Sequence, residues 1–133
     1  MKHKAPAMAL AKDALLKPEQ IKLSSGEWRK RLTPLQYSIL RNGGTESPGS
    51  HEYVHYFPKV GYFACAGCDL PLYSASAKFR DHGWPAWDKC FYSEKQGCHV
   101  LIRLGAEILC SRCRGHLGHV FFGERRTASN ERH

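Results

Sequence analysis

The stretches Cys65-Ala66-Gly67-Cys68 and Cys110-Ser111-Arg112-Cys113 decide the fold of this chain. In each stretch two residues separate the cysteines, so a tight turn can aim both thiolates at one ion. Two such turns complete a tetrahedral shell of four thiolates with no open position, which indicates a structural zinc ion. We therefore predict that Cys65, Cys68, Cys110 and Cys113 bind one zinc ion, which joins two distant parts of a sheet.

Two other interpretations of these cysteines stay open from their spacing alone. The four could form two disulfides or remain as reduced thiols, although paired spacing without a secretion signal favours metal. A redox Cys-x-x-Cys of the thioredoxin kind requires a pair that opens a helix in a βαβ unit. Both pairs instead follow stretches that are typical of strands, so redox chemistry is the weaker alternative.

Length and composition indicate a single domain without a membrane-spanning segment. A chain of 133 residues with 42% hydrophobic residues can bury one core but not two. Its longest apolar runs fall far short of the roughly 20 residues that cross a bilayer. The start, Met1-Lys2-His3-Lys4-Ala5-Pro6, lacks the apolar core of a secretory signal. We expect a cytoplasmic address, with an organellar one as the alternative.

The net charge of +8 is concentrated near the beginning of the chain. Residues 1–33 hold eight Lys or Arg against three acids, which accounts for +5 of the total. The remaining residues are close to balanced, so we expect no nucleic-acid partner. Residues 1–23 have little apolar periodicity and are predicted to form a basic, flexible arm. The ordered domain is expected to span residues 24–133.

Two short helices are expected to lead into a mainly β domain. Ser24-Ser25-Gly26-Glu27 and Thr33-Pro34-Leu35-Gln36 are both capping boxes, and the second helix should end at Asn42-Gly43-Gly44. From residue 53 onward, short runs of β-branched and aromatic residues alternate with turn residues, which predicts antiparallel strands. The expected strands cover residues 53–57, 62–65, 72–74, 99–104, 107–111 and 119–122, with a hairpin turn at residues 104–107.

Two further segments carry candidate functional residues. His116 and His119 follow the second cysteine pair and could hydrogen-bond a polar substrate or move protons near neutral pH. They could equally be satisfied by backbone carbonyls, or form a second metal site with His82. The turn Gly83-Trp84-Pro85 presents an indole that could grip a methyl or thioether group, or belong to an ordinary core.

The order of these motifs closely resembles the B-type peptide-methionine (R)-S-oxide reductases. The resemblance runs from about Trp28 to the last residue. Its most specific part is the second Cys-x-x-Cys followed by His-Leu-Gly-His-Val-Phe at residues 116–121. The other matching motifs are Leu32-Thr33-Pro34 with Gln36-Tyr37, Arg41, Gly44-Thr45-Glu46, the Cys-x-x-Cys at 65, Lys78-Phe79 and Gly83-Trp84-Pro85.

The resemblance implies a β-tent-like fold of two antiparallel sheets, a four-cysteine zinc site remote from the chemistry, and a role in repairing oxidised proteins. The implied substrate is methionine-R-sulfoxide, free or in proteins, and the implied reductant is a thiol supplied by a thioredoxin-like partner. Trp84 would hold the substrate methyl group, while His116 and His119 would orient the sulfoxide oxygen. Arg132 would favour a neighbouring thiolate. We expect the protein to be a monomer.

The chain departs from the family pattern at two thiol positions. The family's nucleophile would follow Arg132-His133, which are the last residues of the sequence. A next codon for selenocysteine read as a stop, a shortened sequence or a decayed gene would each explain this. The family's usual resolving cysteine is absent from Arg80-Asp81-His82, which leaves Cys90 and Cys98 as candidates. The alternative function is therefore an inactive, zinc-stabilised β-module that binds a ligand or peptide.

Overall fold

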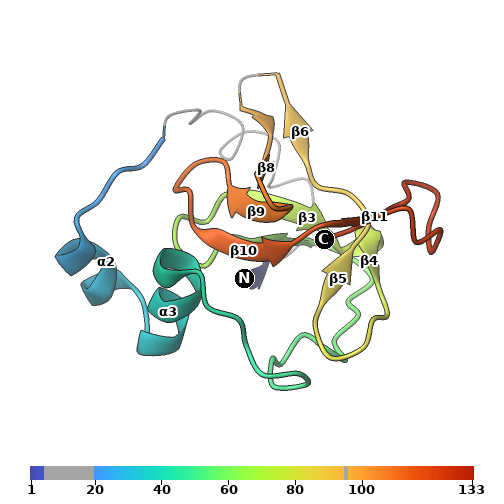
Figure 1. Cartoon of the computed structure of the whole chain (residues 1–133), viewed down its shortest axis with the longest axis horizontal. Coiled ribbons are helices and arrows are strands. Elements are labelled where there is room, and N and C mark those ends of the chain that lie inside the picture. Colours follow the sequence, from blue (N-terminus) through green and yellow to red (C-terminus); the bar gives the residue numbers. More distant parts are fainter. Residues whose placement is uncertain (5–19, 95) are drawn as a thin grey trace.

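The computed structural model describes residues 1–4, 20–94 and 96–133. Two short helices lie beside a set of small antiparallel β-sheets (Figure 1). The helices are α2 (Ser25–Arg31) and α3 (Pro34–Asn42). Among the described residues, no helix is long and apolar enough to cross a bilayer.

Both helices begin, and α3 ends, where the sequence predicts. The side chains of Ser24 and Thr33 accept from the backbone N–H groups of Glu27 and Gln36, and the backbone N–H of each cap residue donates in return to the side chain of Glu27 or Gln36. Gly43 ends α3 in the left-handed conformation, with φ of 70°. These local signals therefore match the start of both helices and the end of α3.

The strands form two three-stranded sheets and three two-stranded ribbons in the described parts of the chain. One sheet has the order β1-β2-β3 and the other the order β10-β9-β8. The prediction of a mainly β fold with antiparallel sheets is thus confirmed. The first sheet contains β1 (Lys2–Lys4), β2 (Tyr62–Ala64) and β3 (Pro71–Ser74); the second contains β8 (Val100–Arg103), β9 (Glu107–Cys110) and β10 (His116–His119).

Two of the ribbons lie between the sheets in the sequence and the third follows the second sheet; their strands are only two residues long. They pair β4 with β5, β6 with β7, and β11 with β12. Their bounds are Lys78–Phe79, Ala86–Trp87, Tyr92–Ser93, Gly97–Cys98, Phe121–Phe122 and Glu131–Arg132, in the order β4 to β7, β11 and β12. Two residues give no measurable period, which is why the sequence does not predict β4 to β7 and β12. The predicted strand at residues 119–122 is divided in the structure between the end of β10 and β11.

Two sequence predictions differ from the structure. No strand forms at residues 53–57: residues 52–55 form successive turns and residues 56–57 have no regular structure, with the N–H of Tyr56 donating to the carbonyl of Tyr53 at 3.3 Å. Their aromatic content reflects packing, since Tyr53 meets Phe63 edge-on at 5.2 Å. Within the predicted flexible arm, Lys2–Lys4 pair with β2, whereas residues 5–19 lie outside the described part of the chain.

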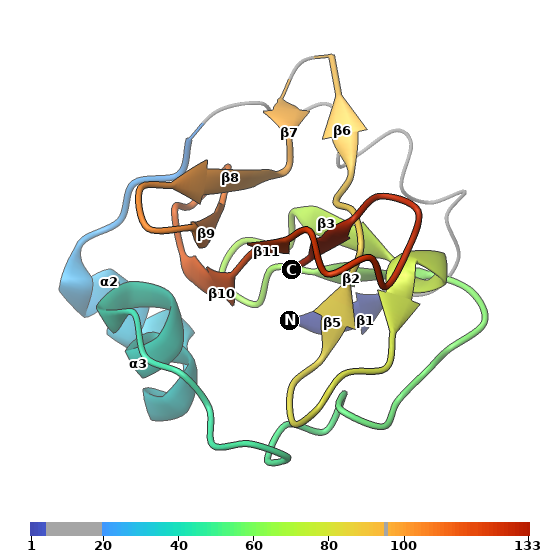
Figure 2. The same ribbon diagram turned by 45° about the vertical axis from the view of Figure 1, so that its right-hand side comes forward.

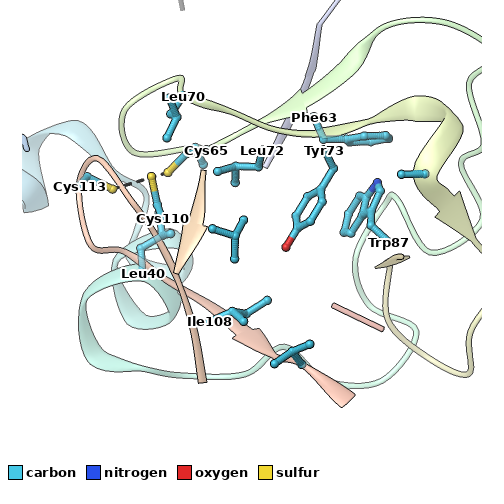
Figure 3. Close-up of a cluster of buried hydrophobic side chains, with 14 of the residues drawn as sticks. Leu40, Phe63, Cys65, Leu70, Leu72, Tyr73, Trp87, Ile108, Cys110 and Cys113 are labelled. Carbon is cyan, nitrogen blue, oxygen red and sulfur yellow. Dashed lines mark hydrogen bonds between the residues drawn. The ribbon is translucent and has the colours of Figure 1, made fainter. Parts of the chain in front are cut away.

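The hydrophobic core extends from the cysteine cluster to an aromatic stack around Trp87 (Figure 3). The Tyr73 and Trp87 rings stack with centroids 4.7 Å apart, and Phe63 meets Trp87 edge-on at 5.0 Å. Tyr73 comes from β3 and Trp87 from β5, so this stack joins the first sheet to a ribbon. Figure 2 shows β5 beside the C-terminus and the first sheet.

Candidate active site and metal centre

The four cysteines form a cluster with the geometry of a metal centre. Their sulfur atoms all lie within 4.8 Å of one another, with Cys65 and Cys113 at 3.7 Å and Cys68 and Cys110 at 3.5 Å. Zn–S bonds of about 2.3 Å in a tetrahedron place sulfur atoms about 3.8 Å apart, so the spacing fits such an ion. The predicted four-cysteine metal site is confirmed as a cluster of ligands.

Backbone groups orient two of the thiolates. Gly67 N–H points to the Sγ of Cys65 at 3.4 Å, and Gly115 N–H points to the Sγ of Cys113 at 3.4 Å. Hydrogen bonds from the other thiols and burial raise the pKa of Cys110. All four thiols can therefore be deprotonated together only when a cation balances their charge.

Helix α3 packs against the second cysteine turn. The guanidinium of Arg41 donates to the carbonyl of Cys113 at 2.8 Å and lies 4.6 Å from the ring of Trp28. Leu40 of α3 fills the space in front of Gly115. Because His116 follows Gly115 directly, the metal centre and the helix together fix the start of β10.

Replacing Gly115 with alanine tests this packing. A Cβ there would lie 2.9 Å from Leu40 Cδ2 and 3.2 Å from Cys113 Sγ, and both neighbours are buried. Overpacking of a close-packed site costs about 1–3 kcal/mol, so Gly115→Ala should lower the free energy of unfolding by that amount in denaturant titrations. Gly26→Ala is the matched control, since nothing lies within 4 Å of its Cβ position in α2. Equal stability of the two variants would contradict the packing argument.

A cavity of about 740 Å³ lies between α3, the second sheet and the C-terminal ribbon. Its walls include the four residues that the sequence singled out as catalytic or substrate-binding: Trp84, His116, His119 and Arg132. These come from three stretches well separated in the sequence. Cys90 and Cys98 do not line it; Cys90 is half-buried against the core and Cys98 is exposed on β7.

The Trp84 loop is held to the segment after α3 by two hydrogen bonds. The indole Nε1 of Trp84 donates to the carbonyl of Glu46 at 2.9 Å, and Gly49 N–H donates to the carbonyl of Gly83 at 2.7 Å. Gly83 has φ of 102°, a backbone conformation that is strained for any residue with a side chain. The indole is therefore oriented by its polar edge, which leaves its apolar surface to the cavity.

The carboxylate of Glu107 joins the two histidines of the site. Glu107 Oε2 pairs with Nε2 of His116, and Oε1 lies 3.2 Å from Nδ1 of His119. The hydrogen bond with His116 holds the pKa of Glu107 below its usual value. His116 is buried and His119 is exposed, so the two rings meet different environments. Within the described residues the only cluster with metal-site geometry is that of the cysteines, so the alternative metal site with His82 is not supported.

Arg132 is fixed by two carboxylates and an aromatic ring. Its guanidinium contacts Glu124 Oε1 at 2.7 Å and Asp81 Oδ2 at 3.0 Å, and lies 4.0 Å from the centre of the Phe121 ring. Arg126 contacts the other oxygen of Asp81 at 2.7 Å. Burial would raise the pKa of Asp81, but the hydrogen bond from Arg126 and the nearby Arg132 lower it. The carboxylate thus stays ionised between two arginines.

The last residue lies at a wall of the cavity. His133 and Trp87 exchange two backbone hydrogen bonds. The N–H of His133 donates to the carbonyl of Trp87 at 2.8 Å, and the N–H of Trp87 donates to the carbonyl of His133 at 3.4 Å. Its Nε2 lies 2.9 Å from Glu131 Oε2, so Nδ1 accepts from the buried hydroxyl of Tyr73 at 3.1 Å. The C-terminal strand is therefore docked on the aromatic core.

Comparisons with known proteins agree with the motifs. The sequence model of the SelR domain matches residues 32–133. The chain belongs to the B-type methionine sulfoxide reductase family. Peptide methionine sulfoxide reductase B3 of Arabidopsis thaliana is 41% identical over 128 residues, covering 90% of this chain and 69% of that protein. The match thus extends well beyond the metal site.

Two other relatives come from a bacterium and a fungus. Peptide methionine sulfoxide reductase MsrB of Bradyrhizobium diazoefficiens is 41% identical over 104 residues, covering 74% of this chain and 73% of that protein. An uncharacterized protein of Schizosaccharomyces pombe is 44% identical over 109 residues, covering 76% of this chain and 75% of that protein. Similar identity therefore occurs across plants, bacteria and fungi.

Sequence reasoning missed Glu107, Asp81 and Glu124 as parts of the site. The second cysteine turn does not by itself identify Glu107: Cys110 N–H bonds to the carbonyl of Gly115, and that register continued without a bulge would place Ala106 opposite His119. A bulge between His116 and Gly118, which the sequence does not predict, moves Glu107 to the position opposite His119. Asp81 and Glu124 lie on loops, where no period predicts which side chains meet.

Proposed function

We propose that this domain reduces the R epimer of methionine sulfoxide to methionine, with thiols as the electron donors. The observation that carries the proposal is the meeting of Trp84, His116, His119 and Arg132 around one cavity. Family membership and the names of the relatives support the same chemistry. The substrate side chain, an apolar methyl beside a polar S=O group, matches an indole wall facing two imidazoles.

In the proposed reaction a thiolate attacks the sulfoxide sulfur and forms a transient S–S bond, which breaks as the oxygen moves to the attacking sulfur. The sulfoxide oxygen receives one proton, methionine leaves with the electron pair of the broken S–O bond, and the attacking thiol becomes a sulfenic acid. A second thiol then forms a disulfide with that sulfur and releases water, and a further dithiol restores the enzyme. The sum is sulfoxide plus two thiols giving methionine, a disulfide and water.

Three residues of the cavity, Trp84, His119 and Arg132, have a direct part in this scheme. The indole of Trp84 packs on the substrate methyl group, in an orientation that its hydrogen bond to Glu46 fixes. His119, whose side chain is 44% exposed, supplies the proton to the sulfoxide oxygen. Arg132 adds positive charge next to the thiolate and lowers its pKa. The reductant that restores the thiol is of the thioredoxin kind, with Cys98 or Cys90 as candidate resolving thiols.

The nucleophile of this scheme would follow His133, at the wall where the C-terminal strand is docked. We propose that a polypeptide of these 133 residues binds the sulfoxide without turnover, because nucleophilic catalysis requires the nucleophile. The experiment compares this polypeptide with one extended by a single cysteine after His133, using R and S sulfoxides and dithiothreitol. Extension by serine is the matched control.

The extended chain is expected to reduce the R epimer and not the S epimer, while the other two chains show almost no turnover. A folded, metal-loaded, cysteine-extended chain that reduces neither epimer would overturn the proposed activity. Robust turnover by the 133-residue polypeptide would instead show that Cys90 or Cys98 acts as the nucleophile, contrary to the assignment given above.

We also propose that the cysteine cluster holds one structural zinc ion. The sulfur spacing, the two cysteine turns and the closed four-thiolate shell support zinc. Metal analysis should find one zinc per chain. The ion would stabilise the start of β10 and take no part in the redox step, because a closed shell leaves no position for the substrate.

A further inference from the structure

Glu107 lies between two histidines that the hairpin β9–β10 brings to one carboxylate. Strands β9 and β10 lie side by side (Figure 1), and Glu107, the first residue of β9, pairs with His119, the last residue of β10. A bulge between His116 and Gly118, where Gly118 has φ of 149°, shifts the register of β10. The bulge lets both imidazoles reach the same side of the hairpin, where one oxygen of Glu107 meets each ring.

An ionised carboxylate only accepts hydrogen bonds, so it determines which nitrogen of each ring carries the proton. The contact through Nε2 requires the Nε2–H form of His116, and the contact through Nδ1 requires the Nδ1–H form of His119. The two histidines are therefore held in opposite tautomers. Nε2 of His119 is then the ring nitrogen left for a substrate.

The exposure of the three side chains separates their roles. His116 is 10% exposed, Glu107 32% and His119 44%. Nδ1 of His116 is fully buried and has no hydrogen-bond partner among the described residues. His116 is thus poorly placed to exchange a proton with solvent or substrate, and it instead fixes the carboxylate from the protein side.

We propose that Glu107 is a positioning residue that presents Nε2 of His119 to the sulfoxide oxygen. When His119 carries both protons, Glu107 accepts the Nδ1–H bond and the Nε2–H proton moves to the oxygen. The neutral ring that remains is the Nδ1–H tautomer, which the carboxylate already stabilises. The inference rests on the proposed function for the identity of the proton acceptor, whereas the tautomers can be measured without turnover.

The first test is NMR of the ¹⁵N-labelled, zinc-loaded 133-residue chain at about pH 9, where histidine is ordinarily neutral. Long-range ¹H–¹⁵N spectra should show His116 as Nε2–H and His119 as Nδ1–H. In Glu107→Ala the Nδ1–H form of His119 should be lost, since a free imidazole prefers Nε2–H. Glu107→Gln keeps the shape of the side chain, yet its amide donates to one ring and accepts from the other, so one tautomer should change.

Glu131→Gln is the matched control, because Glu131 pairs with Nε2 of His133 in a second carboxylate–histidine contact. It should alter the signals of His133 and leave those of His116 and His119 unchanged. The inference is overturned if His119 is already Nε2–H in the parent chain. It is equally overturned if both Glu107 variants, folded and zinc-loaded, keep the parent tautomers.

The second test measures kinetics in the chain extended by one cysteine. General acid catalysis contributes about 10²- to 10⁴-fold, so Glu107→Gln should lower kcat at least about 10-fold while KM changes less than about twofold. A raised KM with unchanged kcat would show that Glu107 touches the substrate, which overturns the positioning role. The two tests can give different answers. If the tautomers respond as expected, the positioning role of Glu107 is supported. If the extended chain then reduces no sulfoxide, the proposed function is overturned.

Discussion

Removal of the metal from the cysteine cluster is expected to unfold the domain. Structural zinc contributes about 10–16 kcal/mol of apparent binding free energy, which matches or exceeds the roughly 5–15 kcal/mol that stabilises a typical domain. The cluster joins the turn after β2 to the turn after β9, and Cys65, Cys110 and Cys113 are part of the buried core. Without an ion, this connection is lost, and the four crowded thiols cannot all ionise. A strong chelator should abolish the far-ultraviolet circular dichroism of the native fold.

The matched substitutions are Cys68→Ser and Cys98→Ser. Cys68 is a cluster ligand, whereas Cys98 is an exposed thiol of β7 outside the cluster. Cys68→Ser should lose stoichiometric zinc and cooperative unfolding, while Cys98→Ser should keep both. A metal-free chain with an unchanged spectrum and melting curve would show that packing alone specifies this fold.

The parts of the fold that sequence predicted well are those that local chemistry determines. The capping boxes at Ser24 and Thr33 and the left-handed Gly43 depend on residues within a few positions of each other, and all appear in the structure. The cysteine turns are equally local. In contrast, residues 53–57 were predicted as a strand because aromatic residues suit strands, whereas here they pack on Phe63 from a series of turns. Tertiary packing overrode the local preference.

The residues of the candidate site also fall into those that the sequence predicts and those that it does not. Trp84, His116, His119 and Arg132 could be selected because a motif order marks them, and the structure brings them to one cavity. Their carboxylate partners could not be selected in that way. Asp81 meets Arg126 and Arg132 across 45 and 51 positions of sequence, a pairing that only the loop geometry specifies. Roles assigned from motifs therefore omit the groups that orient the motif residues.

Trp87 connects the aromatic core to the C-terminal strand, because it contacts both. Its ring stacks on Tyr73 and meets Phe63, and its backbone exchanges hydrogen bonds with His133. His133 is thus supported by the aromatic core, which packs in turn towards the cysteine cluster (Figure 3). A change at Trp87 should affect stability and C-terminal docking together.

Trp87→Ala is expected to lower the free energy of unfolding by about 3–5 kcal/mol, the usual cost of truncating a buried tryptophan. The ring is 2% exposed, so its loss leaves a cavity between β3, β5 and β12. The stack under Tyr73 disappears, and the Tyr73 hydroxyl loses its fixed position against His133 Nδ1. Denaturant titration measures the stability of the zinc-loaded chain, and hydrogen exchange of the His133 amide measures docking of the last strand.

Tyr73→Phe separates docking from packing, since it removes only the hydroxyl that bonds to His133. It should cost about 1 kcal/mol, the net value of one hydrogen bond, and leave the ring stack with Trp87 in place. Hydrogen exchange at His133 should rise in both variants, but the large loss of stability should occur only in Trp87→Ala. If His133 stays protected when Trp87 is truncated, the ion pairs of Arg132 with Asp81 and Glu124 hold the C-terminal strand by themselves, and the aromatic core has no part in presenting the position after His133.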